Sequence, residues 1–265
     1  MTRLDTELVH RGLARSRGQA RDLVVAGNVE VDGRVETRPA TPVAADAVIL
    51  LTAPAEHWVG RGAHKLLAAL ESFGPQGLTI GGRRCLDVGA GVGGFTQVLL
   101  EAGAVHVTSL DVGHGQLARG IADDPRVEER SGTNIRDVGP GELGAAYDVV
   151  VADLSFISLR LTLAAMAALL QPAGDLVVLV KPQFEVGRDR IGRTGVVRSG
   201  ALRRRVLREV VAEAGVVALS VHGLVPSPLP GGDGNREYLL WVSPGPDRAL
   251  AAAHVDTLIE QVEGR

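Results

Sequence analysis

Lys65 and Lys181 are the only lysines among the 28 basic residues of this 265-residue chain. A lysine ammonium is a compact point charge, which a planar guanidinium does not replace where one oxygen must be stabilised. Asp153 and Lys181 each close an apolar run, where packing gives no reason for a charge, and Glu237 opens another in EYLLWV. These four residues are the candidate catalytic groups. Lys65 and Glu237 have an alternative interpretation as solvated ends of a helix and a strand.

A glycine-rich turn, LDVGAGVGGFT (residues 86–96), is the second candidate site. Gly89, Gly91 and Gly94 fit G-x-G-x-x-G, and Asp111 ends the next apolar run, VHVTSLD. Such glycines allow close backbone approach to a ligand, and an acid about 20 residues on can hold ribose hydroxyls. The pattern predicts a nucleoside cofactor, with NAD as the first alternative. Asp87 argues against a phosphate, because a carboxylate there would repel it.

Composition excludes several classes of protein. The chain is 45% hydrophobic and 22% charged, as expected for one large domain and a small one. We expect a soluble protein, because no apolar run approaches the roughly 18 to 20 residues of a membrane span. We expect no signal peptide, because no apolar segment follows Met1. The single cysteine, Cys85, cannot form an internal disulfide and favours a cytoplasmic location. No His/Cys set has the spacing of metal ligands, so no metal is expected.

Basic residues are concentrated in two segments, although the formal net charge is only −3. Residues 11–21 contain arginines and no acid, and residues 181–208 contain nine basic residues against two acids. Solvated helix faces are the ordinary explanation of such clusters. Two clusters in a slightly acidic chain also suggest a polyanion as partner.

Strands and helices alternate regularly from residue 84 onward, which predicts a parallel sheet covered on both faces. Helices are expected at 61–74, from Thr96, after Gln116, from Leu159, from Ala201 and over 247–263. In such sheets ligands bind beyond the carboxyl ends of the strands, so the glycine turn, Asp153 and Lys181 should share one crevice. The last two strands, VVALSVHGL and EYLLWV, are joined by a connection too short for a crossover helix and should pair antiparallel.

The first 50 residues predict a separate unit of two short helices and a strand pair. Asp5 is expected to cap the first helix and Ser16 the second, with leucines, valines and an alanine on the inward faces. VEVDGRVE alternates apolar and polar residues across an Asp-Gly step, which predicts a hairpin.

Several motifs are similar to those of known families. RLD..L..RGLARSR..A..LV..G.V.VDG resembles the S4 RNA-binding domain, and D-x-G-x-G-x-G at 87–93 resembles motif I of S-adenosylmethionine (SAM) methyltransferases. The order Lys, Asp, Lys, Glu is similar to the tetrad of RNA ribose 2′-O-methyltransferases. With GAHKL, VADLSFISL and VKPQFEVG, the whole chain is identified as a member of the hemolysin A/TlyA family.

This resemblance implies an α/β fold, namely a SAM-dependent methyltransferase with a seven-stranded sheet and an antiparallel C-terminal hairpin, preceded by a small α+β S4 domain. The expected boundaries are 1–52 for the S4 domain, 53–62 for the linker and 63–265 for the methyltransferase domain. The implied reaction is 2′-O-methylation of cytidine in 16S rRNA, 23S rRNA or both, with susceptibility to capreomycin-type antibiotics depending on it. The expected partners are ribosomal RNA and ribosomal subunits, with no membrane, and the protein is expected to be a monomer.

The resemblance and the residues together give three sets of site residues. The catalytic set is Lys65, Asp153, Lys181 and Glu237. The cofactor-binding set is Asp87, Gly89, Ala90, Gly91, Gly93, Gly94, Phe95, Asp111, Val112, Asn134 and Asp153. The RNA-binding set is Arg3, Arg11, Arg15, Arg17, Arg21, Arg188 and Arg190.

Two positions depart from the family pattern. The motif I loop is commonly GASTGGFT, whereas Gly91 and Val92 here lack both hydroxyls, and Glu56 stands where the linker usually has arginine. The cofactor is therefore expected to bind more weakly, and the linker is expected to couple RNA binding to cofactor binding in a different way. The alternatives are an RNA-binding protein with vestigial methyltransferase activity, a base methyltransferase and a membrane-active hemolysin.

Overall fold

The computed structural model describes residues 2–14, 17–52, 57–187, 191, 194–232, 234–246 and 249–264. The chain folds into two compact units, Met1–His57 and Trp58–Arg265. Among the described residues, no helix combines the length and the apolar character that crossing a bilayer requires.

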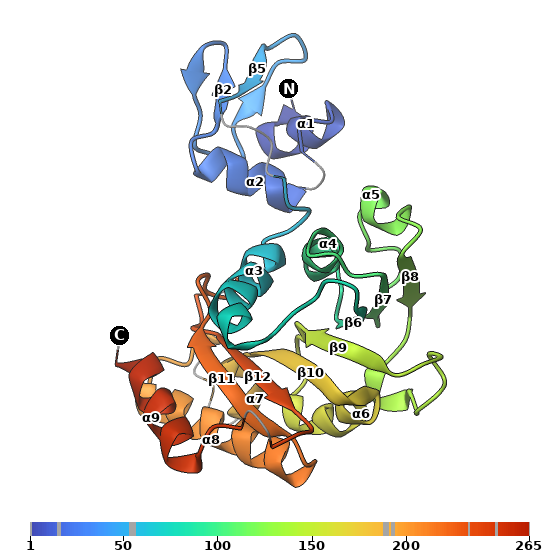
Figure 1. Ribbon diagram of the computed structural model, residues 1–265. Coiled ribbons are helices and arrows are strands. Elements are labelled where there is room, and N and C mark those ends of the chain that lie inside the picture. Colours follow the sequence, from blue (N-terminus) through green and yellow to red (C-terminus); the bar gives the residue numbers. More distant parts are fainter. Residues whose placement is uncertain are drawn as a thin grey trace. The chain divides into compact units, whose positions relative to one another are not determined.

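The N-terminal unit packs two short helices, α1 (Leu4–His10) and α2 (Arg17–Val25), against small sheets (Figure 1). The predicted apolar stripes are confirmed, because Leu4, Leu8, Ala20 and Val24 are fully buried. They share one core with side chains from the strands, which gives this unit a hydrophobic centre of its own.

The predicted hairpin is present as β2 (Val29–Val31) and β3 (Arg34–Val35). Asp32 and Gly33 between them have φ values of 51° and 77°, as the tight hairpin turn requires. The sequence did not reveal β5 (Ile49–Leu51), which adds a third strand beside β2, or the pairing of β1 (Thr2–Arg3) with β4 (Pro42–Val43). Strands of two or three residues are too short to show a period.

The prediction that Asp5 caps α1 is wrong. Arg3 occupies the cap position, without a side-chain cap hydrogen bond, and Asp5 lies inside the first turn. The Asp5 carboxylate instead accepts hydrogen bonds from the guanidinium of Arg3 at 3.0 and 2.7 Å. The predicted Ser16 cap of α2 lies outside the described residues.

The second unit is built on a seven-stranded sheet in the order β11-β12-β10-β9-β6-β7-β8. Its strands are β6 (Arg84–Val88), β7 (His106–Asp111), β8 (Val127–Ser131), β9 (Tyr147–Ala152), β10 (Leu170–Val180), β11 (Ser220–Pro226) and β12 (Tyr238–Ser243). The five strands from β10 to β8 are parallel, and β12 and β11 form the antiparallel end. The predicted mixed sheet with its C-terminal hairpin is confirmed.

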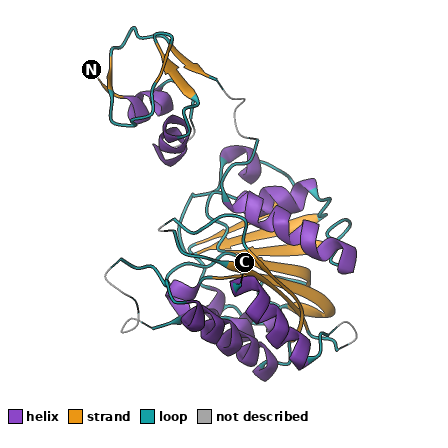
Figure 2. Ribbon diagram, turned by 90° about the vertical axis from the view of Figure 1, so that its left-hand side faces the viewer, coloured by secondary structure: helices purple, strands orange, loops and turns teal. Residues whose placement is uncertain are grey.

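Helices cover both faces of this sheet (Figure 2). They are α3 (Gly62–Phe73), α4 (Gly94–Glu101), α5 (Arg119–Ala122), α6 (Leu163–Ala168), α7 (Pro182–Glu185), α8 (Gly200–Val216) and α9 (Ala252–Glu263), with single 3-10 turns at Gly74–Gln76, Ile135–Asp137 and Leu159–Leu161. One core lies under α3 and α4, and the other under α6, α8 and α9. The helix predicted after Gln116 is reduced to the four residues of α5.

The basic segment 181–208 does not form an open cationic face along α8. Arg204 lies 3.3 Å from Glu260, and Arg208 contacts both Asp256 and Glu260 of α9. Arg203 is largely buried against Glu263, at 2.6 Å. These arginines hold two helices together, which corrects the expectation of a polyanion-binding cluster on this helix.

Candidate active site

The glycine turn joins the end of β6 to the start of α4. Gly89 has φ +84°, and a Cβ there would lie 2.8 Å from the carbonyl oxygen of Asp153. Gly93 precedes α4 with φ +93°, and a Cβ would meet Leu117 at 2.9 Å. Side chains at these positions would clash with the neighbouring loop and strain the backbone, so the turn depends on glycine.

A cavity of about 450 Å³ opens at the carboxyl ends of β6, β7 and β9. The predicted residues on its wall are Gly89, Gly91, Asp111, Val112, Asn134 and Asp153. The cavity is also lined by residues that were not expected from the sequence, among them Gln116, Thr133, Leu154, Ser155, Phe156, Ile157 and Thr162. Residues 154–157 directly follow β9, and that position alone was a signal that they would face a ligand.

Asp111 is fixed by the backbone of two loops. Its Oδ2 accepts a hydrogen bond from the amide of Gly91 at 2.8 Å, and its Oδ1 accepts one from Gly113 at 2.7 Å. A carboxylate held in this way at the end of β7 presents acceptor oxygens to the cavity. This geometry suits the hydroxyl groups of a ribose.

A smaller cavity, about 180 Å³, lies on the glycine turn as well. It contains the predicted residues Ala90, Gly94 and Phe95. Gly89, Gly91 and Asp153 line both cavities, so the two are adjacent across the turn. Gly93 lines neither cavity and acts through the backbone of the turn. An elongated ligand can therefore place one part in each cavity and cross the glycine turn between them.

Asp87 does not face either cavity, which corrects its assignment to the cofactor-binding set. Its side chain is fully buried, and Oδ2 accepts a hydrogen bond from Thr96 Oγ1 at 2.7 Å. Thr96 Oγ1 also lies 2.8 Å from Ser109 Oγ, so the carboxyl group ties α4 to the strands below it. Burial raises the pKa of Asp87 to about 7.

The four candidate catalytic residues form one cluster, and one of them, Asp153, lines both cavities. Lys65 Nζ lies 2.6 Å from Glu237 Oε2 and 3.9 Å from Asp153 Oδ2. Lys181 Nζ lies 2.6 Å from Asp153 Oδ1. The charges thus alternate in one chain of contacts, with Asp153 between the two ammonium groups. The four come from α3, the end of β9, the end of β10 and the start of β12, which are far apart in sequence.

Three members of this cluster are nearly excluded from water, because Lys65 and Lys181 are each 8% exposed and Glu237 is 3% exposed. The side chain of Asp153 is 20% exposed. Burying charges is costly unless each one is paired at close range. Each lysine here has a carboxylate at 2.6 Å, and the two positive and two negative charges balance. Removing one partner of such a pair destabilises a protein by about 3 to 5 kcal/mol.

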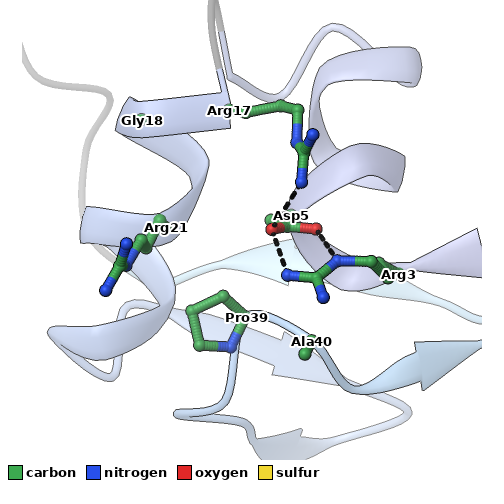
Figure 3. Close-up of a pocket in the computed structure, with 7 residues that line it drawn as sticks. All are labelled: Arg3, Asp5, Arg17, Gly18, Arg21, Pro39 and Ala40. Carbon is green, nitrogen blue, oxygen red and sulfur yellow. Dashed lines mark hydrogen bonds and ion pairs between the residues drawn. The ribbon is translucent and has the colours of Figure 1, made fainter.

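A second candidate site, in the N-terminal unit, is a hollow of about 540 Å³ lined by Arg3, Arg17 and Arg21 with Asp5 (Figure 3). Arg3 and Arg17 both point at Asp5, and Arg17 Nη2 lies 3.5 Å from its Oδ2. The hydrogen bonds from Arg3 hold the pKa of Asp5 well below its usual range. The two guanidinium groups remain more than half exposed, so this carboxylate orients them without covering them.

Arg11 does not belong to this hollow. Its guanidinium donates hydrogen bonds to the carbonyl oxygens of Ala45 at 2.9 Å and Ala47 at 2.6 Å, and it pairs with Glu7. It therefore holds the 44–47 turn to α1, which corrects its assignment to the RNA-binding set. Arg15, Arg188 and Arg190 lie outside the described residues.

Comparison with known proteins bears on the whole chain. Residues 58–243 match the FtsJ-like methyltransferase family, and residues 2–49 match the S4 domain. The 16S/23S rRNA (cytidine-2'-O)-methyltransferase TlyA of Mycobacterium tuberculosis is 47% identical over 260 residues, which cover 98% of this chain and 96% of that protein. The chain belongs to the TlyA/hemolysin A family.

Two further relatives agree with this membership. Hemolysin A of Brachyspira hyodysenteriae is 33% identical over 238 residues, 89% of this chain and 98% of its own. A solved structure from Streptococcus thermophilus, which carries a provisional hemolysin name, is 34% identical with a TM-score of 0.77, over 99% of this chain and 95% of its own.

SAM is the cofactor of this TlyA-family methyltransferase, and the residues present fit it. Asp111 offers acceptors at the end of β7 for a ribose, and the absence of side chains at Gly89 and Gly91 leaves the turn open to a ligand. Asp153, shared by both cavities, provides negative charge where a ligand with a sulfonium and an ammonium carries positive charge.

Two positions of the turn, Gly91 and Val92, carry no hydroxyl. The Gly91 amide itself is bonded to Asp111, so the backbone fixes the turn at this position. Val92 is about half exposed and lies beside Gly60, in whose place a Cβ would meet it at 2.7 Å. Glu56, the other departure, lies outside the described residues.

Proposed function

We propose that the chain transfers a methyl group from SAM to the 2′-hydroxyl of a cytidine ribose in 16S rRNA, 23S rRNA or both. The observation that carries this proposal is the cluster of Lys65, Asp153, Lys181 and Glu237, three of them buried, beside the cofactor cavity. The rRNA (cytidine-2'-O)-methyltransferase name of the Mycobacterium tuberculosis relative supports the choice of nucleotide and RNA.

Lys181 is the group that we assign to the ribose oxygen. A 2′-hydroxyl is a poor nucleophile at neutral pH because its alkoxide is costly to form. An ammonium at about 4 Å, with an effective dielectric constant near 20, stabilises an alkoxide by about 4 kcal/mol, at most about three pKa units of the hydroxyl. Bound SAM would supply an electrophilic methyl group: the 2′-oxygen would gain the methyl as the methyl–sulfur bond breaks, S-adenosylhomocysteine would leave, and the hydroxyl proton would pass to water. The rest of the rate enhancement falls to holding the reacting atoms in line.

The other three residues hold the charge distribution around Lys181. Asp153 lies between the two lysines, at 2.6 Å from Lys181 Nζ and 3.9 Å from Lys65 Nζ, and keeps both ammonium groups at the mouth of the cavity. Glu237 fixes Lys65 from the opposite side. Lys65 thereby adds a positive charge next to the two carboxylates, which offsets their repulsion of the negative charge that develops on the ribose oxygen.

Arg3, Arg17 and Arg21 are the residues that we assign to RNA phosphates. They line one exposed hollow, and arginine forks are suited to phosphate oxygens. Arg15, Arg188 and Arg190 stay predictions from sequence. One chain provides all four catalytic groups, so we infer that the protein acts as a monomer. Its substrate would be the ribosomal subunits, which places its action in the cytoplasm.

The deciding experiment compares the wild type with Lys181→Ala. Ribosomal subunits from a strain that lacks the protein are incubated with labelled SAM, and the modified nucleotide is mapped by alkaline hydrolysis, which a 2′-O-methyl group blocks. We expect the substitution to abolish methylation while RNA binding is kept.

Other outcomes would identify the alternatives. Label that appears without a block to alkaline cleavage would indicate a base methyltransferase, which needs a pocket for a flipped base. An inactive wild type that still binds RNA would indicate a vestigial fold. Leakage of liposomes by the pure protein would support the hemolysin interpretation.

A further inference from the structure

Lys181 has a second partner besides Asp153. Its Nζ donates a hydrogen bond to Ser155 Oγ at 2.8 Å, and Ser155 was not among the residues expected from sequence. Asp153 Oδ1 lies 2.6 Å from Nζ as an ion-pair partner, a contact that depends on charge and only weakly on direction. The hydrogen bond to Ser155 is directional, so it is the contact that orients the ammonium group.

Ser155 stands in a loop with a strained backbone. The next residue, Phe156, has φ +64°, a left-handed conformation that costs a bulky residue about 1 to 3 kcal/mol. Such a conformation persists only where the surroundings hold it. The orientation of the Ser155 side chain therefore depends on whatever fixes residues 155–159.

The segment that carries Lys181 supplies this support. The ring of Phe184 packs on that of Phe156, with centroids 5.1 Å apart. Glu185, almost fully buried, accepts hydrogen bonds from Ser158 Oγ at 2.6 Å and from the Leu159 amide at 2.7 Å. Residues 155–159 and 181–185 are thus joined at three places, of which the contact of Ser155 with Lys181 is one.

We infer that Ser155 is a positioning residue for Lys181: its hydroxyl holds the ammonium group beside the cofactor cavity, in the orientation that faces the ribose oxygen. This inference rests on the proposed function of Lys181. Ser155 also lines the cofactor cavity, so one short loop forms the wall against SAM and sets the lysine. Its hydroxyl acts through Lys181 and is not assigned a contact with the reacting atoms.

A positioning role predicts a specific kinetic pattern. Without the hydroxyl, Lys181 keeps its ion pair with Asp153 and its place over the Phe184 ring, 5.8 Å from the ring centroid. It loses the hydrogen bond to Ser155 and can turn about these less directional contacts. Misplacement of a catalytic group by about 1 Å lowers rates by about 100-fold. Substrate and cofactor would still bind, because their contacts are not removed. The loss therefore belongs in kcat and not in KM.

The test uses the full-length protein and ribosomal subunits. For Ser155→Ala we expect kcat to fall about 10- to 100-fold, while KM for the subunits and the dissociation constant of S-adenosylhomocysteine each change less than about 2-fold. Ser155→Thr keeps a hydroxyl and should restore most of kcat. Ser199→Ala removes a serine that caps α8, far from Lys181 in the sequence, and should leave kcat unchanged.

Three results would overturn the inference. An unchanged kcat in Ser155→Ala, with Lys181→Ala inactive, would reject the positioning role alone. A loss that appears in cofactor affinity, or that threonine does not restore, would assign Ser155 to the packing of the cavity wall. Full activity of Lys181→Ala would reject the catalytic role of Lys181 and, with it, this inference.

Discussion

At the scale of single residues, burial decides what each carboxyl group does. Asp111 and Asp153 both end strands and line the cofactor cavity, where their oxygens accept hydrogen bonds or face ammonium groups. Asp87 lies on the neighbouring strand but is completely buried, with only Thr96 as hydrogen-bond partner of its Oδ2 among the described residues. The same residue type thus serves a ligand at one position and the packing of a helix at another.

The buried position of Asp87 predicts a dependence of stability on pH. Its pKa is about 7 in the folded protein and about 3.9 in an unfolded chain. Between these values the folded state binds more protons than the unfolded state, so the unfolding free energy falls as pH rises. Asp87→Asn removes this titration. Relative to the variant, the wild type should lose about 2 to 3 kcal/mol between pH 5 and pH 8, measured by urea denaturation. An equal difference at both pH values would contradict the assignment.

At the scale of elements, helix pairing decides which basic residues are available to a polyanion. Arg203, Arg204 and Arg208 of α8 face acids on α9. By contrast, Arg3 and Arg17 share one small carboxylate and stay more than half exposed. Charge along the sequence could not separate these cases. The acids that neutralise α8 lie about 50 residues further along the chain.

This difference predicts opposite effects of arginine substitutions. Arg204→Ala and Arg208→Ala should leave the affinity for rRNA within about 2-fold, because these arginines are paired with acids of α9. The variants should still fold, since exposed ion pairs contribute only about 0.2 to 1 kcal/mol to stability. Arg17→Ala and Arg21→Ala should each weaken binding. Filter binding of a 23S rRNA fragment at one fixed salt concentration measures both pairs. Stronger weakening by the α8 substitutions would show that this face binds RNA after all.

At the scale of the whole molecule, a chain with a net charge of −3 must bind RNA through local charge. Each phosphate contact releases counterions, so affinity falls with salt in proportion to the number of contacts. Replacing Arg3, Arg17 and Arg21 together by alanine should therefore make the slope of log affinity against log salt less steep by about two to three. Titrations at several potassium chloride concentrations give this slope. An unchanged slope would remove these arginines from the interface.

The fold was largely predictable because its determinants are local or periodic. The alternation of apolar strands and helices indicated the sheet, and the short connection before EYLLWV indicated the antiparallel end. The predictions failed for short elements such as β5 and α5, because three or four residues are too few to show a repeating pattern of apolar positions. The capping role of Asp5 failed because α1 begins at Leu4, so Asp5 lies inside the helix, where its carboxylate pairs with Arg3 and Arg17.

The sequence by itself determined the chemistry, since the two lysines, the strand-end acids and the glycine turn are recognised by residue type and position. Only the tertiary structure decided which charges meet. It joined Lys65 to Glu237 across 172 positions in the sequence and Lys181 to Ser155. The fold also buries Asp87 in the core and bonds the Arg11 side chain to the backbone carbonyl of Ala47. Contacts of this kind depend on how distant segments pack, and no local pattern of residues records that packing.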